Sequence, residues 1–358
     1  MNCKKRFLLL LLISGLCLSE NMAQQLPFNK GIRILSPKFF PGWQAQHVNF
    51  PFVTYDTAMG LFRMYYAGSS STQVNESLWD QWVTGIATSR NSLEWRGPDD
   101  YEQILFAQKL MEGDVINPDE QSKIFDAVYA VDACVIKDGP GYKCWYMGWN
   151  GEVEHVGGGI TRKKNFRIGY ASSTDGWQWN KQPGAVLSGE DPFVIKENNN
   201  YRMWYVENEG QSRKIHYAVS SDGLSWTKKG AVTGFTEQEA QNPVIIKRAG
   251  QYELWYQGKY NNASQTHIGR AVSADGVSWK KVNDLTLHPE APQRAGRYSP
   301  WTSVSPDAGG KLVLGNVIVL PDNSCQVFYA KQYTVNRELT YGKRSVPISF
   351  IYTERINP

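Results

Sequence analysis

Acidic side chains stand at or just before the start of three apolar segments in this 358-residue chain. They are Asp132, Asp191 with its neighbour Glu190, and Glu239 with nearby Glu237. A carboxylate is costly to bury beside an apolar strand unless it has a partner or a chemical role. If the three segments meet, one carboxyl group could protonate a leaving oxygen, a second could act on water or sugar, and a third could tune the acid. That is the chemistry of glycosidic bond cleavage. An Asp before Pro also caps turns, and that role alone would account for Asp191.

A repeated pattern predicts how these segments are positioned. The motif Ser-x-Asp-Gly-x-x-Trp occurs at 173–179, 220–226 and 273–279, and each copy follows a Trp-Tyr pair and a strand of small residues. Copies spaced by roughly 50 residues are typical of propellers and solenoids. We interpret the motif as structural, because a Ser or Asp oxygen can accept hydrogen bonds from turn amides while the Trp packs between sheets.

Each repeat is expected to contain four short strands joined by turns rich in Gly, Pro and Asn. In the best-defined unit the expected strands are 132–137, 142–148, 167–172 and 177–180. Two further units match this one, a less regular unit precedes it, and a divergent unit follows it. The sequence therefore predicts an all-β, five-bladed β-propeller.

The ring is expected to form a single domain over residues 24–358. Its last strand is expected to come from 349–353, or from 32–35 at the other end of the chain, which would close the ring. Antiparallel strand order places the starts of the innermost strands and the connections between second and third strands on one face.

Aromatic and polar residues of this face are candidates for binding sugar. Four tryptophans are predicted to stack on sugar rings, with core packing as the alternative for each: Trp79, Trp82, Trp149 and Trp301. Glu190, Glu207 and Glu237 are candidates for contacts with the substrate. Three arginines would suit an acidic sugar: Arg162, Arg294 and Arg297.

The charge balance and the N-terminal residues indicate which partners and which location to expect. Lys and Arg number 38 against 34 Asp and Glu, so nothing favours nucleic acid or an anionic membrane as a partner. Residues 1–23 are predicted to be a cleaved signal peptide, with a basic start, an apolar stretch and a small-residue site before Gln24. The apolar stretch is too short to cross a bilayer. We therefore expect a secreted or periplasmic monomer without membrane insertion.

Cysteine and histidine usage is sparse. Cys134 and Cys144 flank a predicted hairpin and could pair, whereas Cys325 is expected to be a small buried residue. The five His residues are scattered without ligand spacing, so we predict no metal site and no cofactor.

At the level of architecture the chain resembles the five-bladed propeller glycoside hydrolases of families 43, 32, 62 and 117. In family 43 an Asp at a strand start is the general base, an Asp-Pro supplies the pKa modulator, and a Glu before Gly-Pro or Ala-Pro is the acid. The resemblance implies that Asp132 is the base, Asp191-Pro192 the modulator and Glu239-Ala240 the acid. Phe50 occupies the position where the first blade of that family carries its Asp.

A second resemblance concerns Glu190-Asp191-Pro192, which is similar to the Glu-Asp-Pro of the mannoside phosphorylases in family 130. Phe193 stands where that family has Arg, which weakens a phosphorolytic interpretation. The sequence thus leads to two hypotheses about function. The first is a secreted glycoside hydrolase acting on oligo- or polysaccharides, and the second is a glycan-binding propeller without catalysis.

Overall fold

The computed structural model describes residues 29–37, 47–69, 82–96, 124–155, 158, 161–261, 266–289, 301–305, 311–339 and 342–357. This part of the chain is built from strands, turns and irregular connections. It contains no helix of the length and apolar character needed to cross a membrane.

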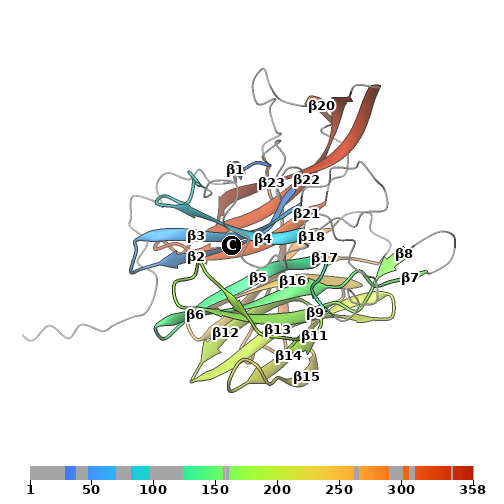
Figure 1. Ribbon diagram of the computed structural model, residues 1–358. Coiled ribbons are helices and arrows are strands. Elements are labelled where there is room, and N and C mark those ends of the chain that lie inside the picture. The colour runs from blue at the N-terminus through green and yellow to red at the C-terminus, as the bar shows by residue number, and fades with distance from the viewer. Residues whose placement is uncertain are drawn as a thin grey trace, which may run out of the picture.

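The strands form antiparallel groups arranged as blades (Figure 1), and short parallel bridges such as that between Arg213 and Glu239 join some neighbouring blades into larger sheets. Blade one holds β2 (His47–Asp56), β3 (Leu61–Ser69) and β4 (Trp82–Ser89). Blade two holds β5 (Tyr129–Asp138), β6 (Gly141–Trp149), β9 (Arg167–Ser173), β10 (Asn180–Lys181) and β11 (Leu187–Ser188). Between β6 and β9 a small hairpin is formed by β7 (Val153–His155) and β8 (Thr161–Lys163).

The remaining blades follow the same order. Blade three holds β12 (Glu190–Glu197), β13 (Asn200–Glu209), β14 (Ser212–Ser220) and β15 (Thr227–Ala231). Blade four holds β16 (Glu239–Arg248), β17 (Gln251–Lys259), β18 (His267–Ser273) and β19 (Lys280–Leu285). Blade five holds β21 (Leu312–Val319), β22 (Cys325–Leu339), β23 (Gly342–Ile356) and β1 (Ile32–Leu35), and β20 (Trp301–Ser305) pairs with the far end of β22.

The five blades close into a ring. The innermost strands β2, β5, β12, β16 and β21 contact one another in this order, and β21 returns to β2. Strand β1 pairs with β23, so the blue N-terminal strand completes the red C-terminal blade (Figure 1). The five-bladed propeller predicted from the sequence is confirmed. Both proposed closing segments are used, because 349–353 lies in the third strand of blade five and 32–35 forms its outermost strand.

The Ser-x-Asp-Gly turns fasten neighbouring blades together. Gly223 N donates to Ser220 Oγ at 2.8 Å, and Asp222 Oδ1 accepts the amide of Leu224 at 2.7 Å. The buried Trp145 of blade two then donates its indole N–H to Gly223 O at 2.8 Å, and Trp204 of blade three donates in the same way to the turn of blade four. The motif is therefore part of the core, as the sequence predicted.

Replacing Trp204 with Ala should lower the free energy of unfolding by about 3–5 kcal/mol, the usual cost of emptying a large buried aromatic site. Trp204 is fully buried, and its indole N–H donates to Gly276 O at 2.7 Å. Urea unfolding followed by fluorescence tests this, with Met59→Ala as a control because Met59 is 52% exposed. If Trp204→Ala lost no more free energy of unfolding than the control, the role of Trp204 as a core residue would be contradicted.

Cys134 and Cys144 do not form the disulfide considered from the sequence. Both thiols are free and buried, as is that of Cys325. In the sheet Cys144 lies opposite Val135, and Cys134 lies opposite Trp145. The Cys134 sulfur instead accepts the backbone N–H of Val194 in blade three at 3.2 Å.

Candidate functional site

The innermost strands of the first four blades start with the same local distortion. A register shift interrupts the pairing of β2, β5, β12 and β16 with their neighbours near the strand start. At this point the backbone adopts a positive φ at Phe50 (47°), Asp132 (54°), Asp191 (49°) and Asn242 (50°). Such bulges redirect a side chain, and strained non-glycine residues cluster at functional sites. The equivalence of Phe50 with the Asp position, expected from the sequence, is therefore visible in the backbone.

A cavity of about 480 Å³ lies at this end of the ring. All five blades line it, for example through Phe50, Tyr129, Asp191, Glu239 and Lys311. Residues of the connections between second and third strands, such as Arg162 and Gln211, also line it. Strand starts and these connections thus share one face, as antiparallel order predicted.

Asp132 and Asp191 form a carboxyl pair, of which Asp191 lines the cavity. Two carboxyl groups this close favour a proton on one of them. Burial raises the pKa of Asp132 well above its ordinary value of 3.8, and the nearby charge of Asp191 raises it further. We therefore place the proton on Asp132. Asp191 lines the cavity and also accepts the backbone N–H of Asn242 at 3.1 Å.

The raised pKa of Asp132 should make stability depend on pH. Above pH 3.8 the unfolded chain releases this proton while the folded protein keeps it, so the stability that neutral Asp132 contributes is lost as pH rises through its folded-state pKa. Asp132→Asn stays neutral and should gain stability relative to the wild type between about pH 4 and pH 8. Urea unfolding of both proteins at the two pH values tests this. If the difference in free energy of unfolding between variant and wild type were the same at both, the raised pKa of Asp132 would be contradicted.

Arg213 of β14 lies among the acidic groups. Its Nη2 is 2.5 Å from Glu190 Oε2 and 3.7 Å from Asp191 Oδ2. Glu190 also accepts a hydrogen bond from Asn208 at 2.8 Å. Burial raises the pKa of Glu190 even though the Arg213 charge opposes this shift. The Arg213 guanidinium, which lines the cavity, thus balances the negative charge of the blade-three carboxylates Glu190 and Asp191.

Glu239 faces the same cavity from blade four and is surrounded by positive charge. Lys259 Nζ lies 3.4 Å from its Oε1, and Arg213 and Lys311 attract it electrostatically. Burial lowers the pKa of Lys311, and the positive charge of Arg213 lowers it further. Three blades therefore bring carboxyl groups to one place, and blade five adds a lysine.

Two other predicted acidic residues lie elsewhere. Glu207 is not part of the cavity wall; its carboxylate contacts Lys228 at 2.5 Å and the Tyr205 hydroxyl at 3.0 Å. Glu237 is 1% exposed and is enclosed by Tyr256 and Lys281. Neither residue lines the cavity, and their contacts with substrate stay predictions.

The two predicted tryptophans whose side chains the structure describes, Trp82 and Trp149, do not line the cavity. Trp149 is 1% exposed and donates its indole N–H to backbone carbonyls of Glu152 and Lys164, so core packing accounts for it. Trp82 stacks on His47, with ring centroids 5.3 Å apart, and packs edge-on to Phe50. Trp79 and the side chain of Trp301 lie outside the described residues.

Sequence reasoning missed the apolar rings that do face the cavity. Phe50, Tyr129 and Phe166 line it. It also missed Arg213 and Lys311, because neither stands in a motif. The parallel bridge between Arg213 and Glu239 joins blades three and four, and no local pattern reveals such a register.

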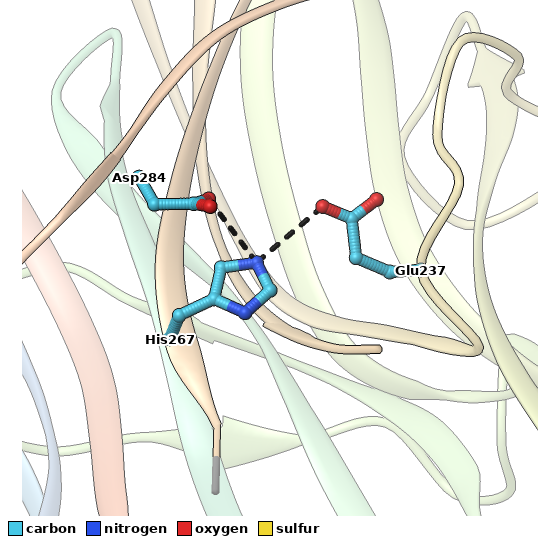
Figure 2. Close-up of side chains that lie close together, drawn as sticks. All are labelled: Glu237, His267 and Asp284. Carbon is cyan, nitrogen blue, oxygen red and sulfur yellow. Dashed lines mark hydrogen bonds and ion pairs between the residues drawn. The ribbon is translucent and has the colours of Figure 1, made fainter. Parts of the chain in front are cut away.

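One group of side chains in the described residues has ligand atoms close enough to hold a metal ion. It consists of Glu237, His267 and Asp284, whose ligand atoms lie within 4.8 Å of one another (Figure 2). Lys281 Nζ is 2.7 Å from an oxygen of each carboxylate. The ammonium group thus supplies the charge compensation that an ion would give, and we treat the group as an ion network.

Comparison with known proteins extends these observations. No family model matches the chain. “Uncharacterized protein Rv1502” and “Uncharacterized protein MT1551”, both of Mycobacterium tuberculosis, are 24% identical to it over 270 residues, which cover 70% of this chain and 81% of each relative.

Solved structures are similar over nearly the whole chain. One described as “Glycoside hydrolase” has a TM-score of 0.57 at 14% identity and covers 95% of this chain and 96% of its own. A glycosyl hydrolase from Bacteroides ovatus has a TM-score of 0.57 at 16% identity, covering 91% of this chain and 94% of that one. A structure described as “The GH130 family of mannoside phosphorylases contains glycoside hydrolases that target beta-1,2 mannosidic linkages in Candida mannan” has a TM-score of 0.56 at 15% identity, with the same coverage. The chain therefore shares its fold with glycoside hydrolases, including one from family 130.

Proposed function

We propose that this protein is a secreted glycoside hydrolase that acts on an oligo- or polysaccharide. The observation that carries the proposal is that Asp191 and Glu239, from two successive blades, line one cavity, and that Asp132 of the preceding blade lies beside Asp191. The apolar rings of Phe50, Tyr129 and Phe166 in the same wall suit the C–H faces of a sugar. The predicted signal peptide at 1–23 supports export.

The electrostatics favour a different assignment of all three roles that the resemblance implied. The Asp132–Asp191 pair holds a proton, and Asp191 faces the cavity, so the pair acts as the general acid through Asp191. As the bond to the anomeric carbon breaks, the single proton of the pair passes from Asp132 through Asp191 to the glycosidic oxygen. Both carboxyl groups are then ionised, and Arg213 stabilises the added negative charge.

Glu239 serves as the carboxylate on the other side of the reaction. Its cationic neighbours are Lys259, Arg213 and Lys311. It either removes a proton from the attacking water or attacks the anomeric carbon itself, and these routes give inversion or retention of configuration.

A second function, glycan binding without cleavage, is favoured by the ion pairs of the cavity. Glu190 is bound to Arg213 and Glu239 to Lys259, so these carboxylates already have partners in the absence of a ligand. A lectin-like cavity would use such groups as fixed hydrogen-bonding partners for sugar hydroxyls.

Product analysis separates the two functions. The purified protein is incubated with a panel of plant, algal and fungal polysaccharides and their oligosaccharides, and products are resolved by carbohydrate electrophoresis. The proposal expects new reducing ends from at least one glycan. If calorimetry shows binding of a glycan that stays intact over days, the binding function holds and hydrolysis does not.

A further inference from the structure

Glu237 and Glu239 are two residues apart but point into different surroundings. The Glu239 side chain is 23% exposed and lines the cavity, whereas the Glu237 side chain is fully buried in blade four. Figure 2 shows the Glu237 carboxylate and the Asp284 carboxylate on either side of the His267 ring. The contrast suggests that the two carboxylates have separate tasks.

Every oxygen of Glu237 is bound. Its Oε1 accepts the Tyr256 hydroxyl at 2.8 Å and the Lys281 ammonium at 2.7 Å, with His267 Nε2 at 3.4 Å. Its Oε2 accepts the backbone N–H of Thr236 at 3.0 Å. Burial opposes ionisation, but the donors outweigh it and lower the pKa of Glu237.

The backbone of Glu237 is also fixed to blade three. Lys214 Nζ donates to the Glu237 carbonyl oxygen at 2.8 Å. The preceding residue, Arg213, bridges to Glu239 and directs its guanidinium to the carboxylates of the cavity. Neighbouring residues of β14 therefore hold both ends of the short segment from Glu237 to Glu239.

We propose that Glu237, with Tyr256, His267, Lys281 and Lys214, is a positioning clamp that sets where the Glu239 carboxylate stands in the cavity. The clamp acts on the backbone immediately before β16, where regular pairing begins with Glu239 opposite Lys259. The inference rests on the proposed function, since it gives Glu237 a role through Glu239. Glu237 itself touches no cavity atom and is not catalytic.

Kinetics of Glu237→Gln test the clamp. Loss of the charge weakens the contacts with Lys281 and His267, so Glu239 should lose its placement and kcat should fall roughly 10- to 100-fold while KM stays within about twofold. Glu253→Gln is the matched control, because Glu253 is also buried in blade four and bound by Arg270 at 2.9 Å, but it lies on β17 opposite Ile246 and not opposite the segment. Equal kcat losses in the two variants would overturn the proposal.

Hydrogen exchange gives a readout that does not need activity. Amides of residues 238–241 should exchange faster in Glu237→Gln than in the wild type, and should be unchanged in Glu253→Gln. Tyr256→Phe removes only one hydroxyl from the clamp and serves if Glu237→Gln fails to fold; it should show the same change to a smaller extent. Unchanged exchange at 238–241 in the folded variants would overturn the clamp whatever the activity. Faster exchange in a protein whose wild type cleaves no glycan would overturn the proposed function instead.

Discussion

Asp191→Asn is expected to lower kcat/KM for glycoside cleavage by roughly 10²–10⁴-fold, the range that positioned acid–base groups contribute. Asp191 is the member of the carboxyl pair that lines the cavity, and Asn cannot pass on the proton held between Asp132 and Asp191. The loss should be smaller for aryl glycosides with an acidic phenol as leaving group, because such a leaving group departs with little protonation. Initial rates on a natural oligosaccharide and on a 4-nitrophenyl glycoside measure both effects.

The control for this experiment is Glu197→Gln. Glu197 is at the far end of the same strand, β12, and pairs with Arg202 at 3.1 Å, away from the cavity. Its kcat/KM should stay within about twofold of the wild type. Wild-type rates for Asp191→Asn on the natural substrate would refute the acid assignment.

Glu239→Gln is expected to reduce kcat/KM by a similar factor, roughly 10²–10⁴-fold, but equally on both kinds of substrate. The reason is that Gln can neither remove a proton from water nor attack the anomeric carbon, whatever the leaving group. Azide should restore part of the rate on the 4-nitrophenyl glycoside, since a small anion can take the place of the lost carboxylate.

The pattern across the two variants decides the assignment of roles. If Glu239→Gln spared the activated substrate and Asp191→Asn did not, Glu239 would be the acid, as the family resemblance implied. The shared proton of Asp132 and Asp191 would then have another purpose.

The fold was readable from the sequence because the propeller repeats itself. The Ser-x-Asp-Gly turn and the buried Trp-Tyr pair recur in each regular blade. Trp145 and Trp204 make the same contact, to Gly223 and Gly276 of the next blade, whereas Trp255 donates to Glu253. The strand starts were less exact: β5 begins at Tyr129, three residues before the expected Asp132, and the positions that share a backbone conformation are the bulges at Phe50, Asp132, Asp191 and Asn242. Local rules suffice when the same local structure is repeated.

The site was only partly readable because its contacts run between blades. The sequence did not show which of Glu237 and Glu239 faces the cavity. Glu237 lies just before β16 and is buried, whereas Glu239 is the first residue of that strand. It could not reveal that Arg213 stands beside Glu190. The sequence left sugar stacking and core packing open for Trp149; at the end of its strand it is covered by Tyr129 and Phe166.

A crystal structure of Asp191→Asn with the oligosaccharide selected by the product analysis tests the central claim most directly. The account predicts a sugar bound in the cavity of about 480 Å³, with the glycosidic oxygen within hydrogen-bonding reach of residue 191 and the opposite face of the ring toward Glu239. An oligosaccharide bound on another face of the ring, with this cavity empty at saturating sugar, would contradict it.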